Sequence, residues 1–192
     1  GDADYNVRAT GTAAAGYWQF SSVSGGSLYG ENYDYDISVA PGEIRWQIFI
    51  TISGTVYTDE GTTTIAAARV VRVKINGSGD YSDETDGSGA YSISGVTITT
   101  AGDTITVYLD VATSTEKANT ITFASSTTEN ITDLDLYQNR IIVRQPTSTA
   151  ISLYHLDAFD NASDTDMLYL ASSTEGTLTA TPTSEFFVWA SS

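Results

Sequence analysis

Short strand-like runs, separated by turn residues at regular spacing, constrain the fold of this chain more than any other feature. Within residues 52–109 the runs alternate or carry β-branched residues, and clusters of Gly, Asp, Asn and Ser bound them. The first run places Ile52, Gly54 and Val56 on one face, and the others lie at 70–75, 90–93 and 104–109. Strands punctuated in this way predict an all-β sandwich.

Further strand-like runs flank this module on both sides. The strongest is 43–52, where alternate residues share one apolar face and predict a single central strand over the core. Later runs lie at 120–123, 131–143 (two strands or one bent strand), 150–156, 167–170, 177–181 and 186–189. No run has the length of an ordinary helix. We therefore expect additional N- and C-terminal strands, the last of which closes the core beside the N-terminal segment.

The organisation expected from these runs has three parts. Residues 1–50 form an N-terminal arm and strands, residues 51–144 form the sandwich, and residues 145–192 supply C-terminal strands that pack with the N-terminal part. The chain starts at Gly1 with no basic and apolar leader, a start that cleavage of a leader would leave. An exported protein, extracellular or on the cell surface, would start in this way, and so would a chain trimmed of further residues.

The charge balance excludes two classes of partner. The chain has 24 acidic and 8 basic residues, for a net charge of −16. Nucleic-acid backbones and anionic membranes both bind clustered Lys and Arg, so neither is an expected partner. No window reaches the roughly 18 apolar residues of a membrane helix. Cysteine is absent, which rules out disulfides and thiol nucleophiles.

No residue pattern indicates catalysis, and we expect no catalytic residues. His155 is the single histidine, it lies in a predicted strand, and no Gly-x-Ser-x-Gly elbow accompanies it. With 24 acidic residues, neighbouring carboxylates arise by chance and carry little information. The sequence therefore predicts a protein that is not an enzyme.

One loop concentrates carboxylates and is a candidate calcium site. Asp157, Asp160, Asp164 and Asp166 fall within ten residues. Calcium takes six to eight oxygen ligands, and closely spaced Asp residues often supply them. The spacing matches no EF-hand, so a solvated turn is the alternative. The acidic residues of 80–86 are a weaker candidate, because hairpin turns use Asp for their geometry.

Three sequons are candidate acceptors for N-linked glycans. They begin at Asn76, Asn130 and Asn161, each at a predicted strand end or loop that an enzyme could reach. If the protein is exported in a lineage that glycosylates Asn, we expect a glycoprotein.

The central module resembles the carboxypeptidase regulatory-like and Cna-B-like families. The matching residues are Gly54-Thr55-Val56 and the runs 68–73, 85–93 (TDGSGAYSI), 103–109 and 134–136, about half the chain. The resemblance implies an Ig-like or transthyretin-like sandwich on a prokaryotic surface, with a spacer, adhesin or fibre role. Some Cna-B-like domains carry a Lys–Asn isopeptide bond; Lys74 lies in a strand, but no matching Asn is evident.

These observations predict a secreted structural subunit that polymerises with copies of itself into a pilus-like filament. The N-terminal strand, around residues 4–20, would fill a groove in the next subunit, as in donor-strand complementation. The alternative for this segment is an ordinary first strand of its own subunit. Register would come from Tyr5, Val7, Tyr17, Trp18 and Phe20. The alternative is an adhesive or carbohydrate-binding module that binds surface glycans through exposed Tyr and Trp, although Trp18, Trp46 and Trp189 lie in strand-like runs suited to core packing.

Overall fold

The computed structural model describes residues 17–19, 35–36, 43–46, 48–110, 116–181 and 184–190. It divides the chain into two units, Gly1–Ile48 and Phe49–Ser192. In the first unit, β1 (Tyr17–Gln19), β3 (Glu43–Trp46) and β2 (Tyr35–Asp36) form a small antiparallel sheet in that order. The expected third part, residues 145–192, lies within the larger unit.

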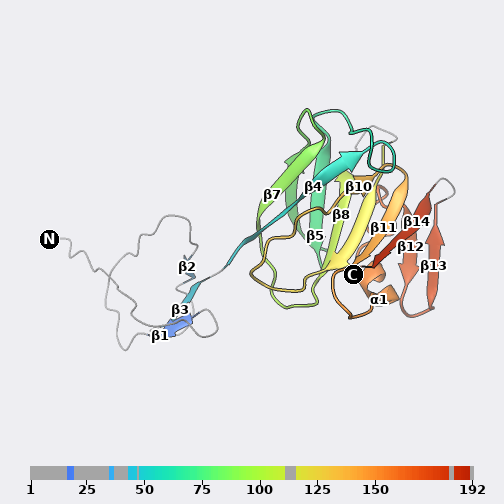
Figure 1. The fold of residues 1–192 in the computed structure, drawn as a ribbon. Helices are drawn as coiled ribbons and strands as arrows, with labels where there is room; N and C mark the ends of the chain where they lie inside the picture. The colour runs from blue at the N-terminus through green and yellow to red at the C-terminus, as the bar shows by residue number, and fades with distance from the viewer. Residues whose placement is uncertain are drawn as a thin grey trace. The chain divides into compact units, whose positions relative to one another are not determined.

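Two sheets form the larger unit (Figure 1). One has six strands in the order β14-β11-β9-β8-β5-β6, and the other has three in the order β10-β4-β7. A two-stranded hairpin, β12-β13, and one short helix complete the unit. The strands are β4 (Ile50–Tyr57), β5 (Val70–Ile75), β6 (Ser78–Glu84), β7 (Ala90–Val96), β8 (Thr104–Asp110), β9 (Asn119–Phe123), β10 (Leu136–Tyr137), β11 (Arg140–Gln145), β12 (Tyr169–Ser172), β13 (Thr177–Ala180) and β14 (Glu185–Ala190).

The predicted all-β sandwich is confirmed. The sheets are mixed, however, because β11 runs parallel to both β9 and β14, and β10 runs parallel to β4. Each parallel pair requires a long connection between its strands. The β9–β11 connection crosses to the smaller sheet and supplies β10, while the β11–β14 connection supplies the helix and the hairpin.

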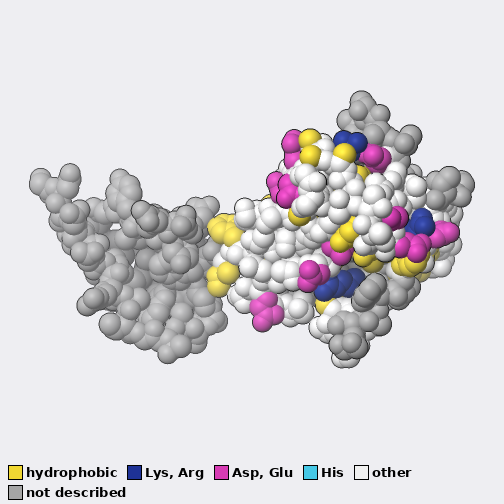
Figure 2. All heavy atoms as spheres, turned by 45° about the horizontal axis from the view of Figure 1, so that its top comes forward, with side chains coloured by type: hydrophobic (Ala, Val, Ile, Leu, Met, Phe, Trp, Pro, Cys, Tyr) yellow, Lys and Arg dark blue, Asp and Glu magenta, His cyan; other side chains and the backbone are white. Residues whose placement is uncertain are grey.

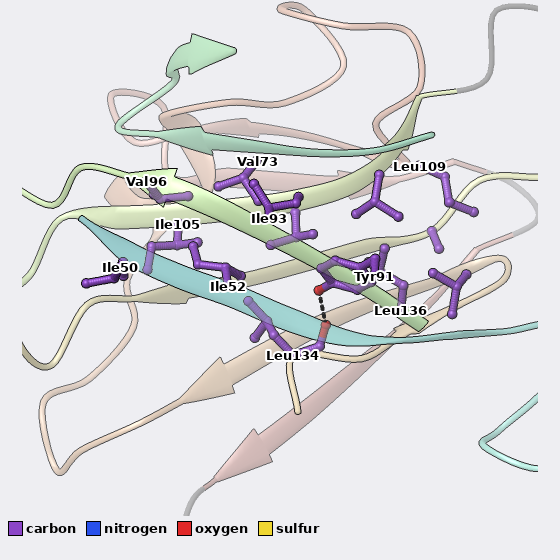
Figure 3. Close-up of a cluster of buried hydrophobic side chains, with 14 of the residues drawn as sticks. Ile50, Ile52, Val73, Tyr91, Ile93, Val96, Ile105, Leu109, Leu134 and Leu136 are labelled. Atoms are coloured by element: carbon purple, nitrogen blue, oxygen red, sulfur yellow. Dashed lines mark hydrogen bonds between the residues drawn. The ribbon is translucent and has the colours of Figure 1, made fainter. Parts of the chain in front are cut away.

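The main core lies between the two sheets (Figure 3). Alternate residues of β4, β5, β7 and β8 point into it, as the period-two pattern predicts. Fully burying each such aliphatic side chain contributes about 1.5–3 kcal/mol. The core residues from these strands are Ile50, Ile52, Val56, Val71, Val73, Tyr91, Ile93, Val96, Ile105, Val107 and Leu109.

A second core covers the opposite face of the six-stranded sheet. Tyr108, Ile121 and Ile141 point from β8, β9 and β11 toward Leu156 of helix α1 (Leu153–Asp157) and Tyr169 of β12. As a result, every residue of β9 is buried, and so is every residue of β8 except Asp110. Strands covered on both faces therefore lack the alternation of buried and exposed residues that a sheet with one solvent-exposed face shows.

The prediction of one central strand over 43–52 is wrong. The segment contributes β3 to the first unit, and β4 begins at Ile50 in the larger one. Ile48, between them, is 47% exposed. Alternation in sequence continues through the boundary, but a strand face is buried only where another layer covers it.

Two further expectations are corrected by local hydrogen bonding. Residues 150–156 were expected to be a strand, yet they lead into helix α1, where His155 lies. Ser152 and His155 cap its first turn reciprocally, with the Ser152 amide donating to His155 Nδ1 at 3.1 Å. The expected acidic turn at 80–86 is mostly strand β6.

The turn before β6 is a two-residue hairpin at Asn76-Gly77. These residues have φ angles of 49° and 73°, which the twist of a hairpin requires. The C-terminal strand β14 pairs in parallel with β11; its expected packing beside residues 1–50 stays a prediction. In the described part of the chain, no helix is long and apolar enough to span a membrane.

Candidate functional site

A short segment around β10 connects the smaller sheet to β9 and β11 of the larger one. We call residues 130–138 the β10 segment. Its backbone bonds to β4 along its length: the Ser53 amide donates to Ile131 O (2.9 Å), the Leu134 amide to Ser53 O (3.0 Å), and the Gln138 amide to Tyr57 O (2.9 Å). These bonds hold the segment in place, and side chains of β9 and β11 donate to its main-chain oxygens.

Gly54 makes this close approach sterically feasible. A Cβ atom added there would lie 2.5 Å from Leu134 O and 2.7 Å from Leu134 C, closer than real contacts allow. The neighbouring strand supplies Tyr91, which pairs with Gly54 in register and donates its hydroxyl to Leu134 O (Figure 3). Burial raises the pKa of the Tyr91 hydroxyl, so it stays a proton donor.

A hollow of about 190 Å³ opens beside this segment. Its apolar part comes from Leu134 and Ile142, which are both buried. The polar groups come from different elements that the fold brings together. The lining residues are Thr120, Asp133, Leu134, Asp135, Tyr137, Ile142 and Arg144.

Asp135 is the most perturbed acid at the hollow. Burial raises the pKa of its carboxyl above the ordinary value of 3.8, outweighing the hydrogen bond that the Thr55 amide donates to Oδ1 at 2.8 Å. The Tyr137 hydroxyl also bonds this carboxylate. Thr120 Oγ1 donates to the main-chain oxygen of Asp135 at 2.6 Å. The carboxylate is thus held in one position at the rim.

Arg144 presents a positively charged group to the same hollow. Its Nη1 donates to Thr132 O and Asp133 O, both at 3.0 Å, which fixes the guanidinium against the β10 segment. Within the described residues, Nε and Nη2 of Arg144 have no hydrogen-bond acceptor. Exposed Asp133 adds a second carboxylate at a left-handed position with φ 55°. Hydrogen-bond donors and acceptors therefore lie next to an apolar floor.

The acidic loop, residues 157–166, is organised differently. Asp160 is 4% exposed, and its two oxygens accept from the Ala162 amide (2.9 Å) and the Ala171 amide (2.8 Å). Asp157 Oδ2 accepts from the Ser173 amide at 2.9 Å. These two carboxylates bond the edge of β12 and stand in for a neighbouring strand.

The other two predicted calcium ligands also bond protein groups. Asp164 Oδ1 accepts from the Asp166 amide at 2.9 Å, and Oδ2 accepts from the Tyr108 hydroxyl at 3.2 Å. Asp166 Oδ1 lies 3.9 Å from Lys117 Nζ. In the described ranges no three Asp, Glu, His or Cys side chains gather as a metal would require. The loop's geometry gives calcium no direct support.

The three sequons differ in what their amides already bind. Asn76 Nδ2 donates to Asp103 Oδ1 at 2.8 Å, and Asn161 Nδ2 donates to Met167 O at 2.7 Å. Asn130 is exposed, and its Oδ1 accepts from the Thr51 amide at 2.8 Å. Its Nδ2 has no acceptor in the described part of the protein. Of the three predicted acceptors, Asn130 is the one whose amide nitrogen is not used by the fold.

The predicted inter-subunit residues are only partly within the described chain. Tyr17 and Trp18 lie in β1, opposite Arg45 and Ile44 of β3. Tyr5, Val7 and Phe20 fall outside the described residues. Trp46 ends β3 and Trp189 lies in β14.

Lys74, weighed for an isopeptide bond, has other partners. Its Nζ donates to Gly79 O at 2.7 Å and lies 5.8 Å from the centre of the Phe159 ring. No Asn side chain is among these contacts.

Sequence reasoning missed the hollow because its polar residues are ordinary in sequence. The one available signal was the alternation Asp133-Leu134-Asp135-Leu136-Tyr137 shortly before Arg144. A scan against protein-family models finds no match to this chain. No curated protein is significantly similar to it either. The family resemblance of the central module therefore remains a resemblance.

Proposed function

We propose that this protein is a secreted, non-enzymatic structural subunit that polymerises with copies of itself by β-strand addition. The observation that carries the proposal is the open C-terminal edge of the six-stranded sheet. Strand β14 ends that sheet, and no described strand pairs with its outer side. This open edge and the composition of the chain support the proposed self-assembly, filament form and extracellular location.

Two other edges in the larger unit, those of β7 and β12, are occupied by side chains. On β7 the Ser92 amide donates to Asp83 Oδ2 at 2.7 Å, and the Thr97 amide reaches the Tyr81 hydroxyl at 3.4 Å, both from β6. At the edge of β12, main-chain amides donate to Asp157 and Asp160 of the acidic loop. Proteins commonly protect edge strands in such ways, because an unpaired edge is a template for another chain.

Strand β14 carries none of the usual protection. Its sequence, EFFVWA, has one charged residue, no Pro and no Lys. Phe186 and Phe187 are 36% and 37% exposed. An edge strand with five apolar residues out of six favours pairing with another strand. Strand β13 also has an open side among the described strands, but it is shorter and rich in Thr.

The proposed mechanism places residues 4–20 of one subunit along β14 of the next. Main-chain hydrogen bonds supply affinity, and alternate side chains fix the register. A head-to-tail contact of this type does not close, so it propagates as a filament. The proposal is consistent with Tyr17–Gln19 forming an edge strand of its own small sheet.

The test uses the full chain and two matched edge variants. Electron microscopy and sedimentation velocity should find filaments for the wild type and monomers after deletion of residues 1–20. Phe187→Glu places a charge on β14 near Arg140, whose guanidinium now lies 5.5 Å from the Phe187 ring centre, and should prevent assembly. Leu178→Glu on β13 is 41% exposed in the wild type and should leave assembly unchanged.

Each outcome decides a different part of the proposal. A wild-type chain that stays monomeric at every concentration overturns the structural function. Filaments that survive the N-terminal deletion overturn the donor strand. Loss of assembly in Leu178→Glu with retention in Phe187→Glu moves the acceptor edge from β14 to β13.

A further inference from the structure

We propose that the hollow beside the β10 segment is a binding site for a single neutral sugar ring. The site is independent of strand addition and uses different residues. It combines a carboxylate from Asp135, a guanidinium from Arg144 and the ring of Tyr137. Three observations identify this class of ligand: the donor and acceptor arrangement, the charge balance and the size.

The hydrogen-bonding groups of the hollow suit hydroxyl groups better than ligand groups that can only donate or only accept a hydrogen bond. Arg144 offers Nε and Nη2 as donors, while Asp133 and Asp135 offer carboxylate oxygens as acceptors. A hydroxyl group donates and accepts at once, so neighbouring hydroxyls on a ring can bond a guanidinium and a carboxylate together. Both groups are held by main-chain bonds, and this pre-organisation lowers the entropy cost of binding.

The charges disfavour ionic ligands. Two carboxylates line the hollow, and acidic side chains are scattered over the face of the larger unit seen in Figure 2, where basic ones are few. An anion would meet this negative potential, which the net charge of −16 extends. A cation would meet the guanidinium of Arg144, which two carbonyl oxygens hold in place. A neutral polar molecule is repelled by neither the carboxylates nor the guanidinium.

The shape of the hollow suits a small ring with one apolar face. Its volume of about 190 Å³ is below the range of drug-sized pockets. Tyr137 stacks on Tyr57 with ring centres 5.4 Å apart, which fixes the aromatic wall above buried Leu134 and Ile142. The C–H face of a sugar can lie against the Tyr137 ring while its hydroxyls reach the rim.

The experiment titrates the full chain with methyl glycosides of glucose, galactose and mannose, followed by amide chemical shifts. At least one should bind with a Kd on the order of 1–10 mM. The shifted amides should belong to residues 133–137 and 142–144. Methylammonium and acetate serve as cationic and anionic probes and should bind more weakly at this place.

Two variants test the residues that line the hollow, and a third is a control for the loss of a positive charge outside it. Arg144→Met keeps the aliphatic stem and removes the donors, so affinity should fall about tenfold or more. Asp133→Asn is exposed and at a φ that Asn tolerates, so it tests binding with the fold intact. Arg140→Met lies on the same strand and face but outside the hollow, and should bind like the wild type.

The proposal is overturned if none of the glycosides shifts these amides at tens of millimolar. It is also overturned if binding persists unchanged in both Arg144→Met and Asp133→Asn. Tighter binding of methylammonium than of every glycoside would assign the hollow to cations instead.

Discussion

The acidic loop and the β10 segment both carry closely spaced Asp residues, yet the fold uses them in opposite ways. In the loop, Asp160 and Asp157 accept main-chain amides and complete the edge of β12. In the β10 segment, Asp135 is half-buried beside a hollow, and burial raises its pKa. Density of charge in sequence therefore does not indicate function. The carboxylates of both regions accept protein donors, and Asp135 differs in that burial raises its pKa and it lines a hollow.

The largest expected effect tests the structural role of the loop. Asp160→Ala removes two amide acceptors from a buried site and should lower the free energy of unfolding by about 3 kcal/mol. Urea unfolding measures this loss. Glu129→Ala, at an exposed position outside the loop, should change stability by less than about 0.5 kcal/mol. Equal losses in the two variants would contradict the structural role.

The next effect tests the close approach at the β10 segment. Gly54→Ala places a Cβ against the Leu134 main chain, so it should cost about 1–3 kcal/mol. Gly87→Ala is the matched control, because nothing lies within 4 Å of the added Cβ there. Thermal unfolding of both variants measures the difference. A Gly54→Ala protein as stable as wild type would mean that the β10 segment is not held against β4.

A smaller effect isolates one hydrogen bond of the same segment. Tyr91→Phe removes the hydroxyl that bonds Leu134 O and should cost about 1 kcal/mol. Hydrogen exchange should speed up in residues 131–138 and stay unchanged in the acidic loop. The control is Tyr154→Phe, whose side chain is 69% exposed. Faster exchange in both regions would show that the two regions are not independent.

The pH dependence of stability should differ in sign between the two regions. The pKa of Asp135 is raised in the folded protein, so ionising it costs stability as pH rises from 3.8 through the folded pKa. The pKa of Asp157 is lowered, mainly by the Ser173 side chain, so its contribution is present above 3.8 and is lost as pH falls through the folded pKa.

Two single-residue variants test these opposite pH dependences of stability. Asp157→Asn should be less stable than wild type at neutral pH and approach it in acid. Asp135→Asn keeps an acceptor for the Thr55 amide, so relative to wild type it should gain stability as pH rises above 3.8. Chemical denaturation at a series of pH values provides the comparison. If the stabilities of the two variants, each relative to wild type, changed with pH in the same direction, the predicted contrast between the two regions would be wrong.

The smallest expected effect concerns calcium. Because the four carboxylates of the acidic loop bond protein donors, calcium should raise the unfolding temperature no more than magnesium does at equal concentration. Chelator-treated protein provides the baseline. A rise specific to calcium, abolished in Asp164→Asn, would restore the loop as a cation site.

Local patterns were sufficient for most of the strands. The period-two burial of Ile50, Ile52 and Val56 and the Asn76-Gly77 hairpin are encoded in a few neighbouring residues. Helix α1 was missed because its cap uses an unusual Ser152–His155 pair on a five-residue helix. The split of 43–52 was missed because the apolar face of a strand does not say which layer, if any, will cover it.

The candidate site could not be predicted because its residues meet only through the parallel crossover from β9 to β11. Asp135 lies in the loop before β10, Arg144 lies in β11 and Thr120 lies in β9. The sequence alone determined the all-β class, the acidic surface and the turns, since these depend on period, charge and backbone conformation of adjacent residues. The tertiary structure decided the rest: which strand stays an open edge, which carboxylates are consumed by main-chain amides, and where one is left facing a hollow.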